Sequence, residues 1–281
     1  MQSQASFPQE PAADRNVRAP VESILSDFSL EKLAAAVELN SAEWLRLESQ
    51  LPWVEFHDDS DVMWMFAGDT WPRNTVALAR FTAATANRRI EEVLAFHLAR
   101  KAACNWIVGP VSAPPDLGRH LRAHGFSCRI HCAGMACDLS TFPSAPPLPP
   151  GGTVRLVDEP PMLVPLTTEL RRRRHLGRKT MAQQRPRRIW CFSAMVDGVP
   201  VGETMLCSGA GVGGIYNVEV REKFRRRGLG SALLHAALSQ ARDLGLRIAV
   251  LGATGMGHAL YSRFNFREVC KLSFYRRKKP E

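Results

Sequence analysis

Several features of membrane and secreted proteins are missing from this sequence. No stretch approaches the ~18 to 20 uncharged apolar residues that a membrane-spanning helix needs. The first 20 residues are polar, contain three prolines and lack the apolar centre of a secretory signal, so we expect residues 1–28 to be a flexible leader. Seven cysteines in 281 residues are an ordinary and odd number. They favour a reduced, cytoplasmic compartment over a disulfide framework.

Acidic residues are few in the second half of the chain. Residues 1–152 carry 13 Lys and Arg against 17 Asp and Glu, whereas residues 153–281 carry 24 against 10. The net charge of +10 therefore belongs to the C-terminal half. Such a field favours an anionic ligand, an acidic substrate or nucleic acid, and does not choose among them.

What is present is a globular chain with one clear internal boundary. Apolar residues make up 45% and charged residues 23%, close to the soluble average. The segment Thr141–Gly152 has five prolines and two glycines in twelve residues, a density that neither a helix nor a central strand tolerates. We therefore expect a linker at 141–152 between one domain at 29–140 and a second at 153–281.

Helical and strand-like patterns occur in both domains, which indicates the α/β class. The Asp197-Gly198 pair predicts a hairpin turn. Helical spacing occurs near 29–49, 87–101, 117–124, 161–184, 228–244 and 256–263, and strand-like runs near 62–67, 76–82, 105–108, 133–139, 153–157, 189–196, 201–208, 214–220, 247–251 and 266–275.

The segment Tyr216–Ser231, YNVEVREKFRRRGLGS, is the most informative. A strand ends at Val220, and a basic turn with Gly228 and Gly230 leads into an amphipathic helix. Glycines permit close approach of a ligand to the backbone, and the free N–H groups of a helix N-terminus attract negative charge. The pattern predicts a phosphate cradle, although its spacing matches neither the P-loop nor the dinucleotide fingerprint.

This segment resembles the coenzyme A signature [RQ]xxGx[GA] of the GCN5-related N-acetyltransferase (GNAT) superfamily. The residues Ala259–Phe266, ALYSRFNF, are similar to the family's LYxxxGF element, with Asn265 where the family usually has glycine. Asn tolerates left-handed geometry, so we expect the turn to survive. The resemblance covers the second half nearly end to end. It implies two GNAT-like domains, each a mixed, mostly antiparallel sheet flanked by helices.

The resemblance also implies the residues that bind the co-substrate acetyl-CoA. The backbone of Val218 and Val220 would pair with the pantetheine arm. The pyrophosphate would be held by the amides of Arg225, Arg226, Arg227, Gly228, Leu229, Gly230 and Ser231. A tight turn without a ligand, and a solvated charge run for the three arginines, are the alternatives.

Tyr261 is the predicted general acid, because a phenol with a pKa near 10 is matched to a departing thiolate with a pKa near 8.5. Packing on the coenzyme without proton transfer is its alternative role. Glu219 and Glu203 are candidate general bases, and each is equally interpretable as a salt-bridge partner. Many family members deprotonate the amine through ordered water, so a base is not required.

The first half resembles a degenerate copy of the same fold. Leu117–Phe126, LGRHLRAHGF, has the LYxxxGF spacing with Leu121 at the tyrosine position, and no [RQ]xxGx[GA] occurs between residues 55 and 125. We expect this copy to bind no coenzyme and to serve as structure or as one wall of the acceptor cleft. Trp64, Trp71 and Trp106 are expected in its core rather than lining that cleft.

The sequence contains two further clusters, one of Cys and His and one of Arg. Cys128, His131, Cys132 and Cys137 lack the paired spacing of a structural zinc site, so no metal is expected. The arginine-rich segment 171–188 is interpreted as a solvated basic face, with an acidic acceptor or nucleic acid as alternatives.

The sequence thus predicts a cytoplasmic tandem GNAT protein that moves an acetyl group from acetyl-CoA to a primary amine of an unidentified small molecule or peptide, by direct attack in a ternary complex. The alternatives are a non-enzymatic basic module for nucleic acid and an acyltransferase that uses a longer acyl-CoA. We expect no membrane partner, and the oligomeric state is open.

Overall fold

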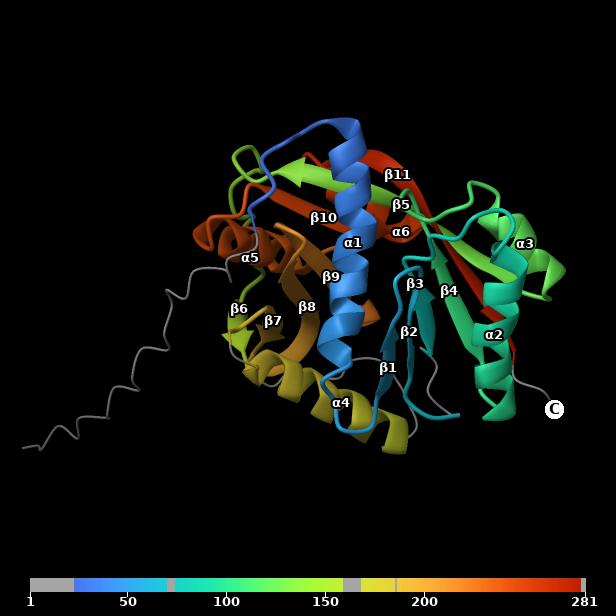
Figure 1. Cartoon of the computed structure of the whole chain (residues 1–281). Helices are drawn as coiled ribbons and strands as arrows, with labels where there is room; N and C mark the ends of the chain where they lie inside the picture. The colour runs from blue at the N-terminus through green and yellow to red at the C-terminus, as the bar shows by residue number, and fades with distance from the viewer. Residues whose placement is uncertain (1–22, 70–73, 159–167, 185, 279–281) are drawn as a thin grey trace, which may run out of the picture.

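A computed structural model of the chain describes residues 23–69, 74–158, 168–184 and 186–278. Within residues 168–174, the side chain is described only for Arg173. The architecture is α/β, as the sequence predicts, with helices on both faces of a twisted sheet (Figure 1).

Most elements of the first half lie close to their predicted positions, but the strand expected near 76–82 ends at residue 77 and the strand expected near 133–139 begins at residue 127. The strand at residues 55–58 was not predicted, because four half-exposed residues show no apolar alternation. The elements in order are α1 (Leu30–Glu48), β1 (Glu55–Asp58), β2 (Met63–Phe66), β3 (Thr75–Ala77), α2 (Ala86–Ala99), β4 (Cys104–Val108), α3 (Leu117–Ala123) and β5 (Ser127–Asp138).

The second half follows its predicted order as well. Asp197 and Gly198 both have positive φ angles, +50° and +77°, the left-handed geometry that a two-residue hairpin turn requires. The elements are β6 (Gly152–Val157), α4 (Thr168–Gln183), β7 (Ile189–Val196), β8 (Val199–Gly209), β9 (Val212–Val220), the 3₁₀ turn η1 (Glu222–Phe224), α5 (Leu229–Asp243), β10 (Ile248–Ala253), α6 (Gly255–Ser262) and β11 (Arg267–Arg277).

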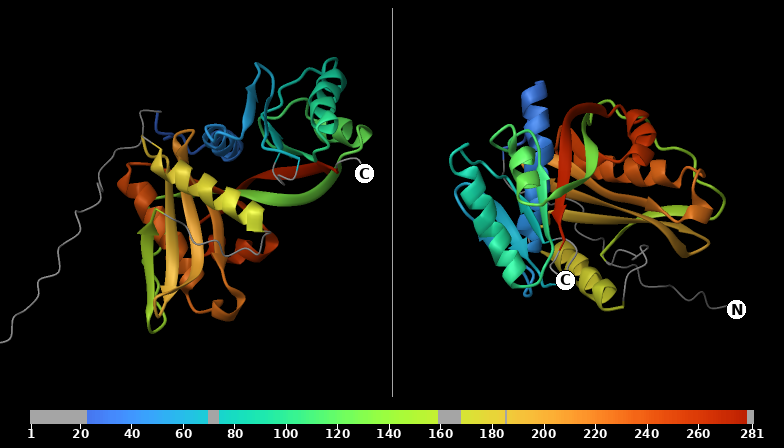
Figure 2. Two further views of the ribbon diagram at one scale, coloured as in Figure 1. Left: turned by 90° about the horizontal axis from the view of Figure 1, so that it is seen from below. Right: turned by 90° about the vertical axis from the view of Figure 1, so that its right-hand side faces the viewer.

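The last strand of each half is inserted into the other half. β5 lies between β10 and β11, and β11 lies between β4 and β5, all antiparallel. The two halves therefore share one eleven-stranded sheet in the order β1-β2-β3-β4-β11-β5-β10-β9-β8-β7-β6 (Figures 1 and 2). Local periodicity does not reveal which strand is the neighbour of a strand more than a hundred residues away. The exchange was accordingly not predicted, and the boundaries 29–140 and 153–281 remain predictions.

Each strand near the exchange buries side chains on both faces of the sheet. In β10, Ile248 and Val250 join the apolar cluster under α1, whereas Ala249 and Leu251 join the cluster under α5. α1 lies against strands of both halves on one face. On the opposite face, α5 and α6 cover the second half and α2 and α3 cover the first (Figure 2). Burial on both faces makes β10 a continuous apolar run rather than an alternating one.

The proline-rich segment between Asp138 and Gly152 forms neither helix nor strand. It is attached to α5, where the ring of Phe142 contacts His235 edge-on at 5.5 Å and lies 5.0 Å from the guanidinium of Arg242. The segment therefore lacks helix and strand, as its proline density predicts, and it packs along a helix of the second half.

Candidate functional site

The strand and helix of the predicted cradle stand where two parallel strands diverge. β9 and β10 form only two residue pairs, the last of them Gly214 with Val250. Beyond that pair β9 continues to Val220 and β10 to Ala253, and β10 pairs with β5 on its other side. Among the described residues, no strand pairs with this edge of β9 beyond Gly214, and the carbonyl oxygen of Val220 accepts a hydrogen bond from Nε of Arg225. Such an edge lies at the carboxyl ends of the strands, the usual binding position in open α/β sheets.

A β-bulge lies at the point of divergence. Between the pairs Glu203–Glu219 and Met205–Tyr216, β9 has one residue more than β8. Asn217 adopts the left-handed conformation there, with φ at +53°. Its side-chain Nδ2 atom lies 3.6 Å from the sulfur atom of Met205. A bulge bends a strand and redirects the residues that follow. The sequence contains no glycine at this position, and the bulge was not predicted.

The redirected residues face opposite sides of the sheet. Val218 and Val220 pack against the apolar cluster under α5. Glu219 pairs directly with Glu203, and such paired residues project to the same face. Glu219 therefore lies on the face opposite Val218.

The turn before α5 presents a row of free backbone amides. The amide of Arg225 donates to Glu222 and that of Ala232 donates to Gly228. In the described part of the chain, no backbone acceptor is found for the amides from residue 226 to residue 231. Left-handed φ angles at Arg226 (+59°) and Gly228 (+80°) curve the turn. A concave row of N–H groups at a helix N-terminus is an anion-binding arrangement.

The two glycines of the turn are not equivalent. A Cβ atom at Gly228 would lie 2.9 Å from the carbonyl oxygen of Pro147, in a left-handed conformation that side chains disfavour. A Cβ atom at Gly230 would lie 3.7 Å from Leu260 and 3.9 Å from Val220, which is ordinary contact. Only Gly228 is required by the geometry of the described residues.

Two of the three arginines before Gly228 already have protein contacts. The Nε atom of Arg225 donates to the carbonyl oxygen of Val220 at 3.0 Å, at the end of β9. The guanidinium of Arg227 lies 5.6 Å from the ring centre of Phe224. Contact of these side chains, or of the backbone amides, with a phosphate remains a prediction.

Tyr261 lies on α6 beside this turn. Its neighbour Leu260 faces the Cα atom of Gly230, and its ring makes an edge contact with Phe266 at 6.0 Å. Burial raises the pKa of Tyr261 to about 12. Its ring lies directly over Gly257, where a Cβ atom would come within 2.6 Å of Cε2. Gly257 was not predicted as a site residue, although a glycine one turn before the tyrosine was the available signal.

The two candidate bases differ in environment. Glu203 is fully buried, and its carboxylate accepts a hydrogen bond from Nη1 of Arg178 at 2.8 Å. This geometry supports its alternative role as a salt-bridge partner, because both side chains of the pair are almost wholly buried. Glu219 is half-buried on the same face, next to the bulge. It stays the better placed of the two for proton transfer.

The corresponding place in the first half is filled by the chain itself. β3 and β4 are also parallel and are followed by α2 and α3. Here the amide of Ala113 donates to Ala79 at 2.8 Å, and the amide of Phe81 donates to Ala113 at 3.1 Å. In the first half, the loop after β4 therefore occupies the strand edge that corresponds to the open edge of β9 in the second half.

The N-terminus of α2 carries hydrogen bonds within its own first turn. The Thr82 amide donates to Oγ1 of Thr85, and the amides of Thr85 and Ala86 donate to the carbonyl oxygen of Thr82. Leu121, at the position of the tyrosine, is fully buried in the core. The expectation that the first half binds no coenzyme stays a prediction.

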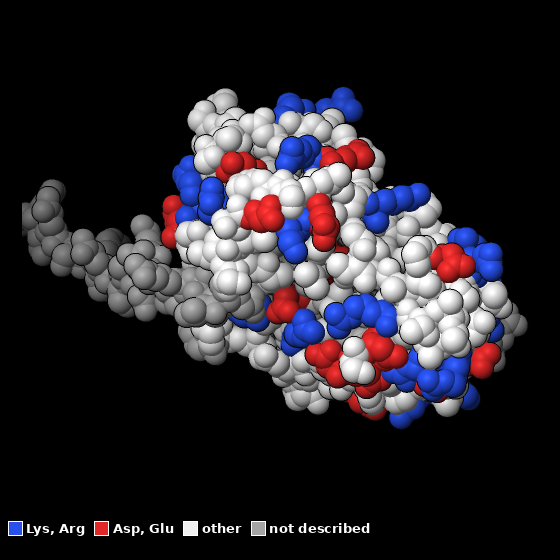
Figure 3. Space-filling view, turned by 45° about the horizontal axis from the view of Figure 1, so that its top comes forward, with Lys and Arg blue, Asp and Glu red and all other residues white. Residues whose placement is uncertain are grey.

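The arginine-rich segment is engaged inside the protein. Nη2 of Arg173 donates to Ala67 of the first half at 2.7 Å, and Arg188 forms a 2.9 Å ion pair with Glu43 of α1. The side chains of residues 171, 172, 174 and 185 lie outside the described residues. Acidic and basic side chains alternate over the face of the molecule in Figure 3. The described arginines thus connect elements of the structure, rather than forming the predicted solvated face.

Other predicted clusters are dispersed. Trp64 and Trp106 are buried in the core under α2, as expected, and Trp71 lies outside the described residues. Cys132 and Cys137 belong to different apolar clusters on opposite faces of the sheet. Among the described residues, no three His, Cys, Asp or Glu side chains are grouped as metal ligands.

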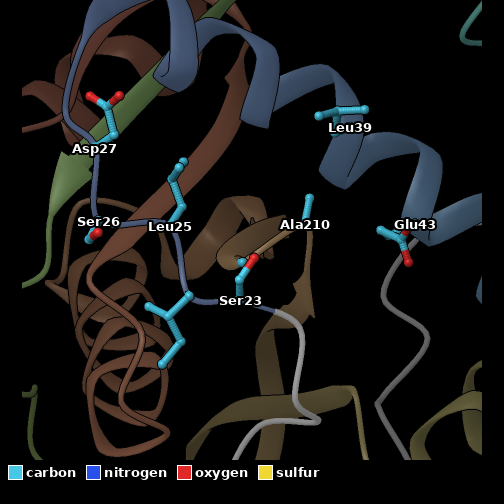
Figure 4. A pocket seen from close by; sticks show the side chains of 9 residues that line it. Ser23, Leu25, Ser26, Asp27, Leu39, Glu43 and Ala210 are labelled. Carbon is cyan, nitrogen blue, oxygen red and sulfur yellow. The ribbon is translucent and has the colours of Figure 1, made fainter.

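A pocket of about 670 Å³ lies away from the cradle. The segment Ser23–Asp27 lines it together with Leu39 and Glu43 of α1 and with Ala210 (Figure 4). It shares no residue with the predicted site. Among the helices described, none combines the length and the hydrophobicity of a bilayer-spanning segment.

Comparisons with known proteins agree with this geometry. The model of the acetyltransferase (GNAT) family matches residues 158–266. A GCN5-related N-acetyltransferase from Kribbella flavida is 18% identical, with 88% of this chain and 96% of that chain covered and a TM-score of 0.63. A tandem GNAT protein from the clavulanic acid biosynthesis pathway is 16% identical, with 92% and 98% covered and a TM-score of 0.54.

A third similar structure is a GCN5-related N-acetyltransferase from Sphaerobacter thermophilus. It is 19% identical, with 95% and 97% of the two chains covered and a TM-score of 0.55. At such identities the similarity shows the fold alone. A search of curated protein sequences finds no match to this chain.

Proposed function

Residues 158–266 belong to the GNAT acetyltransferase family, and from this premise we propose that the protein is an N-acetyltransferase. It would move an acetyl group from acetyl-CoA to a primary amine by direct attack in a ternary complex. The donor supplies the activated thioester. The protein binds it, orients it and supplies the proton for the leaving group.

One observation carries the proposal. A row of unbonded amides, an unpaired strand edge and a tyrosine hydroxyl all belong to one corner of the second half. The amides from residue 226 to residue 231 would hold the pyrophosphate. The amide of Arg225, which was also predicted to do so, already donates to Glu222. The backbone of Val218 and Val220 would pair with the amides of the pantetheine arm, as another strand would.

The proposed chemistry follows from two side chains. The departing thiolate needs a proton, and a phenol whose pKa is raised to about 12 by burial stays protonated throughout the neutral range. Tyr261 is therefore the proposed general acid. Glu219 is the proposed base, directly or through ordered water, because it lies beside the bulge on the face opposite Val218.

The alternatives gain less support. A nucleic-acid module needs a free basic surface, whereas Arg173, Arg178 and Arg188 contact protein groups. A longer acyl donor shares every proposed contact with acetyl-CoA, so donor length is a matter for experiment. The acceptor is proposed only as a primary amine.

The test is an isothermal titration of acetyl-CoA into the full chain, beside the Gly228→Glu variant. The variant places a carboxylate in the row of amides, so it should lose micromolar binding while keeping the melting temperature within a few degrees. Turnover is then measured over a panel of amines with acetyl-CoA and butyryl-CoA. Absence of binding at millimolar coenzyme would overturn the proposal, and equal use of butyryl-CoA would assign a broader donor range.

A further inference from the structure

A buried asparagine of the first half binds the strand that carries the proposed site. Asn40 lies on α1 and is fully buried. Its Oδ1 atom accepts a hydrogen bond of 2.7 Å from the hydroxyl group of Tyr216 on β9. Its Nδ2 atom donates to the carbonyl oxygens of Cys207 at 3.3 Å and Gly209 at 2.9 Å on β8. One side chain therefore connects α1 to two strands of the second half.

The packing around this contact is close. A Cβ atom at Gly214 would lie 1.8 Å from Oδ1 of Asn40, so the helix approaches β9 only because residue 214 is glycine. Trp44, one turn further along α1, places its ring 4.8 Å from that of Tyr216 at an angle of 39°. Helix and strand are thus held by a hydrogen bond and an aromatic contact together.

The contact lies where β9 leaves β10. Gly214 forms the last pair between the two strands, and Asn217 is the left-handed residue of the bulge. Tyr216 stands between them. From this juxtaposition the geometry points to Asn40 as a positioning residue: through Tyr216, it fixes the β9 bulge and the open strand edge at which the proposed acyl transfer takes place. The inference rests on the proposed function.

The first half of the chain would then serve to hold β9 of the second half in position. Groups that bind a reacting carbonyl have to be placed within roughly half an ångström of the productive geometry. A bulge with a left-handed asparagine holds such a geometry only when its surroundings determine it. α1 supplies those surroundings from behind β9, on the face opposite α5.

The test variant is Tyr216→Phe, which removes the hydroxyl group and leaves both bonds from Asn40 to β8. We expect kcat to fall about tenfold, equivalent to about 1.4 kcal/mol of activation free energy. The Kd of coenzyme A should rise by a smaller factor than kcat falls, because the amides before α5 are untouched and only the strand edge beside them shifts. The stoichiometry of coenzyme binding shows that the folded fraction is unchanged.

The matched control is Tyr275→Phe, in the first half's core. The hydroxyl group of Tyr275 is likewise hydrogen-bonded, as acceptor from Nη1 of Arg122 at 3.1 Å. This variant should share any modest fall in melting temperature and keep the kcat of the unchanged protein. The double variant that combines Tyr216→Phe with Asn40→Ala should lose no more kcat than Asn40→Ala alone, because Tyr216 and Asn40 act through one contact.

The possible failures are distinguishable. If the unchanged protein binds no acetyl-CoA and acetylates no amine, the proposed function fails. If it is active and Tyr216→Phe keeps its kcat, or loses coenzyme affinity and kcat in equal proportion, the positioning role of Asn40 is overturned. Additive losses in the double variant would likewise overturn it.

Discussion

The ring of Tyr261 lies over the Cα atom of Gly257, so closely that a Cβ atom there would come within 2.6 Å of the ring. We predict that Gly257→Ala lowers kcat by about 10²-fold, because a displacement of about 1 Å at a reacting group has an effect of that size. Coenzyme affinity should change little, since the amides before α5 are not involved. Steady-state kinetics beside a coenzyme titration measure both.

Gly255 provides the control for this variant. It begins the same helix, and nothing lies within 4 Å of the Cβ position. Gly255→Ala should leave kcat unchanged and raise the melting temperature slightly, because alanine is favoured over glycine in helices by about 1 kcal/mol. Equal kcat in both variants would show that the position of the Tyr261 ring has no part in turnover.

Tyr261→Phe tests proton donation itself. Loss of a general acid typically costs about 10² to 10⁴ in rate, so we expect kcat to fall by about 10²-fold with coenzyme affinity retained. The hydroxyl group of Tyr261 can donate its proton only while it is protonated, and the protonated form is lost as pH rises through about 12. The unchanged protein should accordingly show no loss assignable to Tyr261 between pH 7 and about 10. A parallel fall of affinity and kcat would indicate packing on the coenzyme alone.

The pair Gly228→Ala and Gly230→Ala tests the cradle. Gly228 is left-handed and faces the Pro147 carbonyl oxygen at 2.9 Å from its Cβ position. The strain of an alanine there is about 1 to 2 kcal/mol, so coenzyme affinity should fall about tenfold as the turn rearranges. Gly230→Ala meets only ordinary contacts and should bind as the unchanged protein does. Calorimetric titration of both variants decides, and the reverse ranking would place the coenzyme against Gly230.

Local features were the ones that the sequence predicted well. The Asp197-Gly198 turn, the left-handed Asn265 and the amphipathic α5 depend on neighbouring residues, and all three are present. Asn265 does more than tolerate its geometry, because its Nδ2 atom also donates to the carbonyl oxygen of Thr141 at 2.6 Å.

Features that depend on distant partners were not predicted. Glu203 and Arg178 are 25 residues apart in sequence, and α1 meets β9 across more than 160 residues. Neither pairing leaves a periodic signal. The bulge at Asn217 was likewise not predicted, because it appears only in the register of β9 against β8, although Asn tolerates the left-handed conformation that it adopts.

Glu203→Gln separates a structural role from proton transfer. The carboxylate and Arg178 are both almost wholly buried, and breaking such a pair by removing one partner costs about 3 to 5 kcal/mol. We expect this loss of unfolding free energy in chemical denaturation, and a similar loss for Arg178→Met, which removes no base. Glu203→Gln with unchanged stability and abolished turnover would instead identify Glu203 as the base.

Glu38 is a buried carboxyl group in the same helix as Asn40. Its two oxygen atoms accept hydrogen bonds from the amide of Val111 at 2.7 Å and the hydroxyl group of Ser112 at 2.6 Å. These residues belong to the loop that fills the strand edge of the first half. Burial is the main cause that raises the pKa of Glu38 above its ordinary value, and the hydrogen bonds oppose it.

The sign of the resulting pH dependence follows from this shift. A carboxyl group with a raised pKa binds its proton more tightly in the folded state, so its contribution to stability is present below the ordinary pKa and is lost as pH rises through the folded value. Glutamine at position 38 keeps an acceptor for Val111 and a polar contact for Ser112, and it carries no charge. Glu38→Gln should therefore gain unfolding free energy relative to the unchanged protein as pH rises above 4.5, with a slope of at most about 1.4 kcal/mol per pH unit. Urea denaturation of both proteins between pH 4 and 8 measures the difference, in which the carboxyl groups common to both cancel. A difference that is constant over this range would mean that Glu38 titrates alike in the folded and unfolded chain.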